Sequence, residues 1–257
     1  MIDLHSHILP NIDDGSQSLE ESIQIIKQAV SNGVTDIVVT PHFILGSIYN
    51  SQREVNKKIL KTLTAKLIEE NININLYLGN EIFIDIDMLQ NLLKKKTSSL
   101  NDSRYVLFEL PMNSEYKNIR KTLFDLQNAG YVPIIAHPER YRVVKENPQI
   151  VMEWQEAGAI FQSNIGSLSG RYGKEAKKTL ELLLKHQFIT FLSSDIHHST
   201  DAFYQDIDKT KKILKKIITA DYIEDLFSNN ARKALKNEKI ATRTVIPITK
   251  NAFGIYK

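Results

Sequence analysis

The sequence predicts an α/β protein built as a distorted, TIM-like (β/α)7 barrel. Strand-like and helix-like segments alternate along the whole chain, seven strand-like runs occur without an intervening linker, and metal-type side chains follow most of these runs. The length of 257 residues fits one barrel or two small domains, and the seven strands without a linker favour one domain. We therefore expect a single domain over residues 1–257, with its core over about 1–236 and an irregular extension over 237–257.

The seven predicted strands are short runs of β-branched or apolar residues. Segments with helical periodicity separate them, and a helical crossover between consecutive strands makes the strands parallel. In chain order the predicted strands are Ile2–His5, Asp36–Thr40, Ile74–Leu78, Tyr105–Leu110, Val132–Ala136, Ala159–Gln162 and Ile189–Leu192.

Capping residues mark the ends of several predicted helices. Ser18 with Glu21, and Ser51 with Glu54, match the Ser-x-x-Glu capping box, in which side chain and backbone satisfy each other's unpaired groups. Left-handed residues that end helices are expected just past three helical patterns, at Gly33, Gly130 and Gly158.

The composition excludes several functional classes. The chain has no cysteine, which removes disulfides, thiolate metal sites, iron–sulfur clusters and thiol nucleophiles. Its net charge is +3 and its basic residues are dispersed, so we expect no nucleic-acid partner. It lacks an apolar run of roughly 18 residues, so we expect no membrane insertion. Its start is rich in His and Asp, so we expect no signal peptide and a cytoplasmic location.

Histidines and carboxylates lie just beyond six of the seven predicted strands. The carboxyl ends of parallel barrel strands meet at one rim, where the active sites of such folds are built. Core packing does not explain this clustering, whereas His186 and His198 are isolated and are better explained as ordinary surface or hydrogen-bonded histidines. The candidate ligands are His5, His7, Asp14, His42, Glu81, Glu109, His137, Asp195 and His197.

This ligand set contains only imidazoles and carboxylates, which suits manganese, iron or zinc. Nine candidates exceed what one or two ions need, so we expect three divalent ions that share bridging carboxylates. Three such ions carry more positive charge than the four carboxylates neutralise, which favours an anionic substrate. Hydrolysis of a phosphate monoester is the chemistry that clustered metals serve best.

The motifs then become specific for a known family. Asp3-Leu4-His5-Ser6-His7 with Asp13-Asp14-Gly15, Thr40-Pro41-His42, Ala136-His137-Pro138-Glu139-Arg140-Tyr141 and Ser194-Asp195-Ile196-His197 resemble the PHP (polymerase and histidinol phosphatase) superfamily and its fold. Asn101-Asp102-Ser103-Arg104-Tyr105 and the Glu-Arg-Tyr after His137 resemble one branch of it, the bacterial manganese-dependent protein-tyrosine phosphatases of capsular and exopolysaccharide loci. The resemblance covers roughly residues 1–236.

The resemblance implies a role for each candidate residue. Arg140 would contact the phosphate, since its planar fork suits a bidentate contact. Asp13 is an open alternative to Asp14. The family's second arginine, after the Asp-x-His motif, is missing here, and Arg171 is a candidate replacement. The resemblance implies three ions. The first would be held by His5, His7, Glu81 and Asp195, and Glu81 would bridge to a second ion held by Glu109 and His137. The third would be held by Asp14, His42 and His197.

The expected activity is hydrolysis of phosphotyrosine on protein, with three Mn²⁺ ions as cofactor and Fe or Zn as alternatives. A hydroxide bridging two ions would attack phosphorus in line, and His42 or His197 is a candidate general acid. The resemblance implies a bacterial tyrosine kinase with a Tyr-rich tail as the protein substrate. A small-molecule phosphatase, such as a histidinol-phosphate phosphatase, and a non-catalytic metal-bearing binding module are the alternatives.

Overall fold

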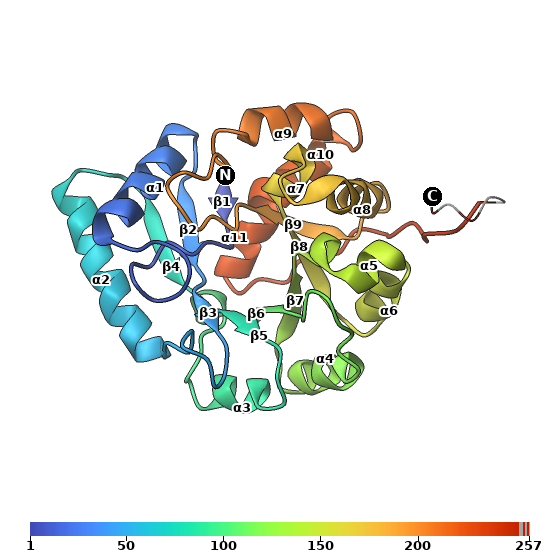
Figure 1. The fold of residues 1–257 in the computed structure, drawn as a ribbon, viewed down its shortest axis with the longest axis horizontal. Helices are drawn as coiled ribbons and strands as arrows, with labels where there is room; N and C mark the ends of the chain where they lie inside the picture. Colours follow the sequence, from blue (N-terminus) through green and yellow to red (C-terminus); the bar gives the residue numbers. More distant parts are fainter. Residues whose placement is uncertain (252–253, 255, 257) are drawn as a thin grey trace.

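The computed structural model describes residues 1–251, 254 and 256, and its strands are divided between two parallel sheets (Figure 1). One sheet has the order β1-β2-β4, and the other has the order β3-β5-β6-β7-β8-β9. The strands are β1 (Ile2–Asp3), β2 (Asp36–Val39), β3 (His42–Phe43), β4 (Asn75–Leu78), β5 (Glu81–Phe83), β6 (Tyr105–Glu109), β7 (Val132–Ala136), β8 (Ile160–Asn164) and β9 (Ile189–Ser193).

The helices form a ring around these strands (Figure 1). The α-helices are α1 (Leu19–Ser31), α2 (Arg53–Glu69), α3 (Met88–Leu93), α4 (Ile119–Asn128), α5 (Arg142–Glu146), α6 (Ile150–Glu156), α7 (Ile165–Ser169), α8 (Gly173–Lys185), α9 (Ile207–Leu214), α10 (Ala220–Glu224) and α11 (Asn230–Leu235). Two 3₁₀ turns, η1 (Leu100–Asp102) and η2 (Pro138–Arg140), and a π-helical turn, η3 (Asp225–Asn229), complete the set.

All seven predicted strands are present, and β3 and β5 are two short strands that the sequence did not predict. Each follows a break in the strand before it. Pro41 has no N–H and interrupts the ladder after β2. Asn80 spans the break after β4, because its side chain donates to Pro41 O and accepts from Ser98 N. The ladder then resumes in the same order, so the pairs β2/β3 and β4/β5 each occupy the place of one barrel strand.

The first predicted strand is shorter than expected, because regular pairing ends at Asp3. The next residues nevertheless stay extended between their neighbours. Ser6 forms an isolated parallel bridge with Ile196, and its carbonyl accepts a hydrogen bond from Thr40 N at 2.9 Å. This segment therefore lies between the ends of β2 and β9 and brings the last strand next to the first.

Asp3 reinforces the same junction from a fully buried position. Its carboxylate accepts hydrogen bonds from the Ser194 backbone and hydroxyl and from the Tyr204 hydroxyl at 2.8 Å. A buried carboxylate is stable only when such donors replace its water. Asp3 therefore ties β1 to the segment that follows β9.

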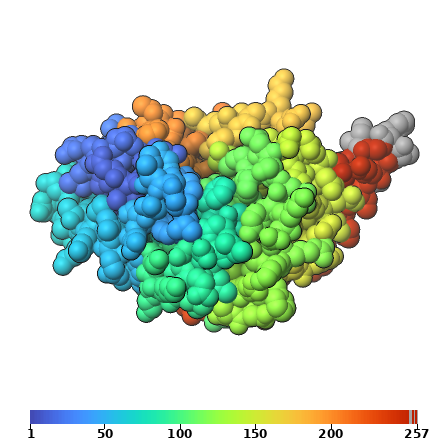
Figure 2. Space-filling view, turned by 60° about the horizontal axis from the view of Figure 1, so that its bottom comes forward, coloured from blue at the N-terminus to red at the C-terminus, as the bar shows by residue number. Residues whose placement is uncertain are grey.

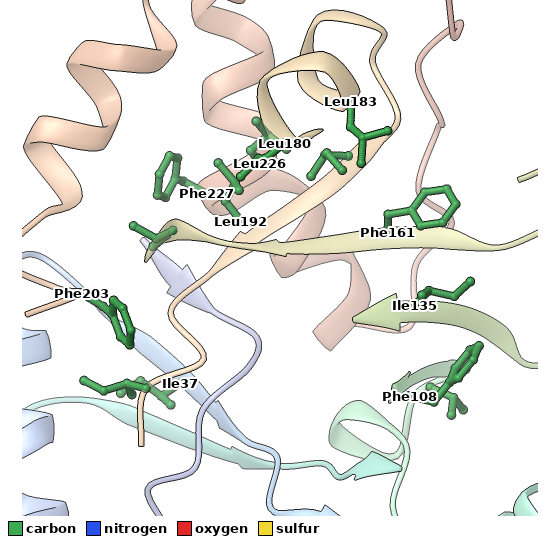
Figure 3. Packing of buried hydrophobic residues seen from close by; sticks show 14 of the residues in the cluster. Ile37, Phe108, Ile135, Phe161, Leu180, Leu183, Leu192, Phe203, Leu226 and Phe227 are labelled. Atoms are coloured by element: carbon green, nitrogen blue, oxygen red, sulfur yellow. The ribbon is translucent and has the colours of Figure 1, made fainter. Parts of the chain in front are cut away.

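Side chains of successive strand residues alternate between two buried apolar clusters. The outer cluster lies between strands and helices. Figure 3 shows Phe108, Ile135 and Phe161 projecting from β6, β7 and β8, and Leu180 beside Leu226 in the same cluster. The inner cluster occupies the barrel interior and includes Val38, Tyr105, Leu107, Ile134, Ala136, Ile160 and Phe191.

Of the two predicted capping boxes, the first is present in its Ser18 half and the second is wrong. The Ser18 hydroxyl accepts from Glu21 N at the start of α1, whereas the Glu21 carboxylate accepts from Gln17 N, one residue before the cap. Helix α2 begins at Arg53 without a side-chain cap, because the Ser51 hydroxyl donates to Asn56 instead. The left-handed helix ends are confirmed, with positive φ at Gly33, Gly130 and Gly158.

The chain after α11 forms no helix or strand over the described residues; Ala252, Phe253, Ile255 and Lys257 of the predicted extension lie outside them. Figure 2 shows this red segment against the yellow-green part of the chain. Its first residues contact the amino end of β6, where the Tyr105 hydroxyl donates to Glu238 O and accepts from Ile240 N. None of the helices described is long and apolar enough to cross a membrane.

Candidate metal centre

Four buried ligand-type side chains converge just beyond the ends of β1 and β9 and at the first residue of β5. His5 Nε2 and His7 Nε2 lie 3.1 Å apart. Glu81 Oε2 lies 3.2 Å from the first nitrogen and 3.3 Å from the second, and Asp195 Oδ1 lies 3.3 and 3.4 Å away. One atom from each of the four residues therefore faces a common point, and all four are at most 2% exposed.

A second group of four adjoins the first and shares His7 with it. Asp14 Oδ1 lies 3.5 Å from His42 Nε2 and 3.6 Å from His197 Nε2. The His7 and His197 rings stack with their centroids 4.1 Å apart. This group is more open than the first, because the Asp14 side chain is 48% exposed.

A third group is formed by His42, Glu81 and Glu109. His42 Nδ1 lies 3.2 Å from Glu81 Oε2 and 3.4 Å from Glu109 Oε1. His137 Nε2 lies 2.9 Å from Glu81 Oε1 and 3.9 Å from Glu109 Oε2. The structure thus brings together all nine candidate ligands, with Glu81 central to the arrangement.

The geometry distinguishes between Asp13 and Asp14 as the candidate metal ligand. Asp13 Oδ2 accepts from the far side of the His7 ring, at Nδ1, over 2.8 Å, and from His42 N over 2.9 Å. Asp13 therefore orients His7 and leaves His7 Nε2 facing the centre, as second-sphere carboxylates do in metal sites. Asp14, not Asp13, is the carboxylate that faces the His42 and His197 rings.

The electrostatics of the centre favour a bound cation. Burial opposes ionisation of Glu81 and Asp195, yet the His5 ring beside them helps to hold the pKa of each carboxyl well below its usual range. Burial and the charges of Glu81 and Asp195 raise the pKa of Glu109 to about 9. A nearby divalent ion would reverse this effect on Glu109 and allow all the carboxylates to ionise.

The hydrogen bonding points the same way. His42 Nδ1 is buried beside two carboxylates but has no hydrogen-bond partner among the described residues. The facing nitrogens of His5 and His7 can share only one proton between them. Lone pairs gathered in this manner suit a metal ion, so the residues present fit the inferred metal centre.

Two residues of the centre have left-handed backbones that non-glycine residues rarely adopt. His137 has φ of +33° and Asp195 has φ of +53°. Such conformations persist only where the surroundings impose them, and they cluster at functional sites. Each occurs at or just after a strand end, where it turns the side chain into the centre.

Arg140 lies at the edge of the centre and contacts one of its carboxylates. Its Nη1 donates to Asp195 Oδ2 over 2.9 Å, and the guanidinium carbon lies 4.4 Å from the centroid of the Tyr172 ring. Arg140 does not pair with Glu139, which instead accepts from Asn164 N and the Ser167 hydroxyl. Tyr172 has no motif around it, so the sequence did not identify it.

Arg171 lies further out. Its guanidinium carbon is 4.9 Å from the centroid of the Phe203 ring, and its Nη2 is 3.6 Å from Asp206 Oδ2. The Phe203 ring in turn stacks on Tyr172, with centroids 6.4 Å apart. Two aromatic rings therefore separate Arg171 from Arg140.

The two remaining histidines have ordinary partners. His186 Nδ1 lies 2.8 Å from the carbonyl of Ile246 in the C-terminal segment. His198 Nδ1 lies 3.5 Å from Glu21 on α1. Neither belongs to the groups described above.

Fold and site together define a class: a barrel-like α/β protein whose strand ends carry a histidine–carboxylate centre fit for divalent metals. The chain belongs to the family described as "Capsular polysaccharide synthesis, CpsB/CapC", which matches residues 1–236. The chain is 33% identical over 264 residues to the tyrosine-protein phosphatase YwqE of Bacillus subtilis, with all of both chains covered. The family resemblance inferred from the sequence is confirmed.

Solved structures agree with this assignment. One matching structure comes from a study of YwqE of Bacillus subtilis and CpsB of Streptococcus pneumoniae, which are described as unique metal-dependent tyrosine phosphatases. The TM-score is 0.89 and the sequence identity is 33%, with 97% of this chain and 100% of the other covered. A histidinol phosphate phosphatase of Lactococcus lactis matches with a TM-score of 0.56 and 16% identity, over 84% of this chain and 93% of its own. The second likeness concerns the fold alone, and it supports the predicted PHP-type barrel.

Proposed function

We propose that this protein is a metal-dependent protein-tyrosine phosphatase that hydrolyses phosphotyrosine on a protein substrate. The observation that carries the proposal is the convergence of nine imidazole and carboxylate side chains beside Arg140, in a chain without cysteine. The names of the relatives support phosphotyrosine over histidinol phosphate as the substrate. The complete ligand set argues against a binding module without catalysis.

We assign the ligands to three divalent ions, of which Mn²⁺ suits the mixed oxygen and nitrogen donors. His5, His7, Glu81 and Asp195 would hold the first, and Glu81, Glu109 and His137 the second. Asp14, His42 and His197 would hold the third. When bound, the ions would supply Lewis-acid stabilisation of the phosphoryl oxygens and lower the pKa of water.

The chain's own residues would bind and orient the substrate. Arg140 presents a permanently charged fork, one N–H of which is used by Asp195, so the others can contact phosphate oxygens. Burial lowers the pKa of His42 and His197, which leaves both rings neutral and suited to ligation rather than to acid catalysis. The phenolate leaving group has a pKa of about 10 and needs little protonation.

The family's description places its members in capsular polysaccharide synthesis. We therefore propose, with the resemblance drawn from the sequence, that the substrate is a bacterial tyrosine kinase with a Tyr-rich tail that controls polysaccharide export. A flexible tail suits a centre whose outer edge, at Asp14, is exposed.

The test compares kcat/KM on a phosphotyrosine peptide and on histidinol phosphate, with metal content measured on the same samples. We expect the peptide to be preferred, about three divalent ions per chain, as the nine ligands imply, and loss of metal and activity in Glu81→Gln. Glu153→Gln is the matched control, because Glu153 is an exposed residue paired with Arg120. Full activity in metal-free protein would refute the metal centre, and preference for histidinol phosphate would refute the substrate.

A further inference from the structure

We propose that Gln162 and Asn164 on β8 are positioning residues that fix the proton of His5 on Nδ1 and hold Asp195 with one oxygen toward the centre. This inference rests on the proposed metal centre, because it concerns how two of its ligands are oriented. β8 is the strand that delivers no candidate ligand, and the structure shows it delivering two amides to the same place.

A continuous chain of hydrogen bonds joins Asp195 to His5 through these amides. Asn164 Nδ2 donates to Asp195 Oδ2 over 2.6 Å. Gln162 Nε2 lies 3.0 Å from Asn164 Oδ1 and 2.8 Å from Ser163 O. Gln162 Oε1 lies 2.8 Å from His5 Nδ1. Both amide side chains are fully buried, so no water competes for these contacts.

The chemistry of the end groups sets the direction of this chain. An ionised carboxylate only accepts, so Asn164 must present its NH₂ to Asp195 and its oxygen to Gln162. Gln162 must then present its own NH₂ to Asn164, and the carbonyl of Ser163 demands the same orientation. Its oxygen is therefore left for His5, whose Nδ1 must carry the proton. His5 Nε2 thus keeps a free lone pair.

That lone pair points at the common point of the first ligand group. His5 Nε2 lies 3.2 Å from Glu81 Oε2 and 3.3 Å from Asp195 Oδ1. The same chain restrains the second oxygen of Asp195, which leaves Oδ1 facing His5 and His7. A histidine whose outer N–H is held in this way is the usual arrangement in metal sites, although the acceptor here is an amide.

Packing alone does not account for the two amides. Residues 160, 162 and 164 share one face of β8, and Ile160 fills the barrel interior with an apolar side chain. Burying two amides instead is costly unless each finds partners, and these partners are two ligand residues of the centre. Gln162 and Asn164 therefore lie between the apolar barrel interior and the metal centre.

The test uses Gln162→Met, which keeps the length of the side chain and removes its strong acceptor, and Gln162→Glu, which keeps an acceptor for His5. Zn²⁺ affinity is measured by competition with a chelator, and nitrogen NMR of the Zn²⁺-loaded wild type reports which His5 nitrogen carries the proton. Asn230→Leu is the matched control, because Asn230 is a buried amide that donates to Thr190 O at the amino end of β9.

We expect a proton on His5 Nδ1, a 10- to 100-fold weaker Zn²⁺ affinity in Gln162→Met, and a smaller loss in Gln162→Glu. Asn230→Leu should lower the melting temperature without changing affinity. A proton on His5 Nε2, or wild-type affinity in Gln162→Met, would overturn the positioning role while leaving the metal centre intact. A wild-type protein that binds no Zn²⁺ would overturn the proposed centre itself. The NMR measurement needs no variant, so it holds even if Gln162→Met fails to fold.

Discussion

Replacement of Arg140 is the sharpest test of how the substrate phosphate is held. Among the described residues, one side-chain hydrogen bond leaves the guanidinium, from Nη1 to Asp195 Oδ2 at 2.9 Å. The ring of Tyr172 supports its face at 4.4 Å, and the side chain is 26% exposed. The fork is therefore fixed in place with most of its N–H groups available to a phosphate at the open edge of the centre.

The expected magnitude follows from the contact that is lost. A charge-assisted bidentate contact to phosphate contributes roughly 2–4 kcal/mol to transition-state stabilisation, so Arg140→Ala should lower kcat/KM by about 30- to 1000-fold. Arg140→Lys restores the charge but not the planar fork. The lysine side chain is shorter than that of arginine, and its ammonium group is more strongly hydrated than a guanidinium. This variant should therefore recover only part of the loss.

The contact with Asp195 adds a second route by which Arg140 could act, and metal content separates the two. Asp195 is 2% exposed and also accepts from Asn164, so it keeps one donor when Arg140 is removed. We expect bound metal to stay unchanged in Arg140→Ala while kcat/KM falls. Arg120→Ala is the control, since Arg120 makes an exposed pair with Glu153.

Two results would refute this reasoning. Loss of metal in Arg140→Ala would make the residue a support for Asp195 rather than a phosphate contact. Activity within about threefold of wild type, an effect of only ~0.6 kcal/mol, would leave Arg140 no part in binding.

Two further predictions concern particular contacts, and a third concerns the composition. A Cβ at Gly15 would lie 1.9 Å from His7 O, so Gly15→Ala should displace His7 and lower both metal content and melting temperature. Because the chain has no cysteine, iodoacetamide should leave the activity intact while a chelator abolishes it; thiol-sensitive activity would contradict the assignment. Arg243 binds Asp221 and Asp225 far from the centre, so Arg243→Ala should lower the melting temperature by only about 2–4 °C and leave kcat/KM unchanged.

The sequence predicted the location of the centre because chemistry and strand ends coincide. Glu109 ends β6 and His137 follows β7, while His42 and Glu81 begin β3 and β5, the short strands that come after β2 and β4. Their residue types are uncommon in apolar interiors. The breaks at Pro41 and Asn80 were not predicted, because a two- or three-residue strand has no periodicity to detect.

The supporting residues were harder to identify. Asp13 stands beside Asp14, and no local pattern distinguishes a carboxylate that orients a histidine from one that faces the centre. Tyr172 and Asn164 have no metal-ligand signature, and each gains its role from a residue distant in the sequence, Arg140 or Asp195. Tertiary contacts of this kind become visible only once the strands are placed beside one another.

The register of the strands explains why one fold both packs its interior and builds the centre. Inward positions on β6 run Tyr105, Leu107 and Glu109, and those on β8 run Ile160, Gln162 and Asn164. On both strands the inward face is apolar at the amino end and polar at the carboxyl end. The packing of the apolar residues therefore fixes where the polar side chains of the same face lie. A one-residue slip of β6 would exchange the two faces and turn Glu109 toward the helices. Apolar packing of Tyr105 and Leu107 is therefore part of what places Glu109 beside Glu81.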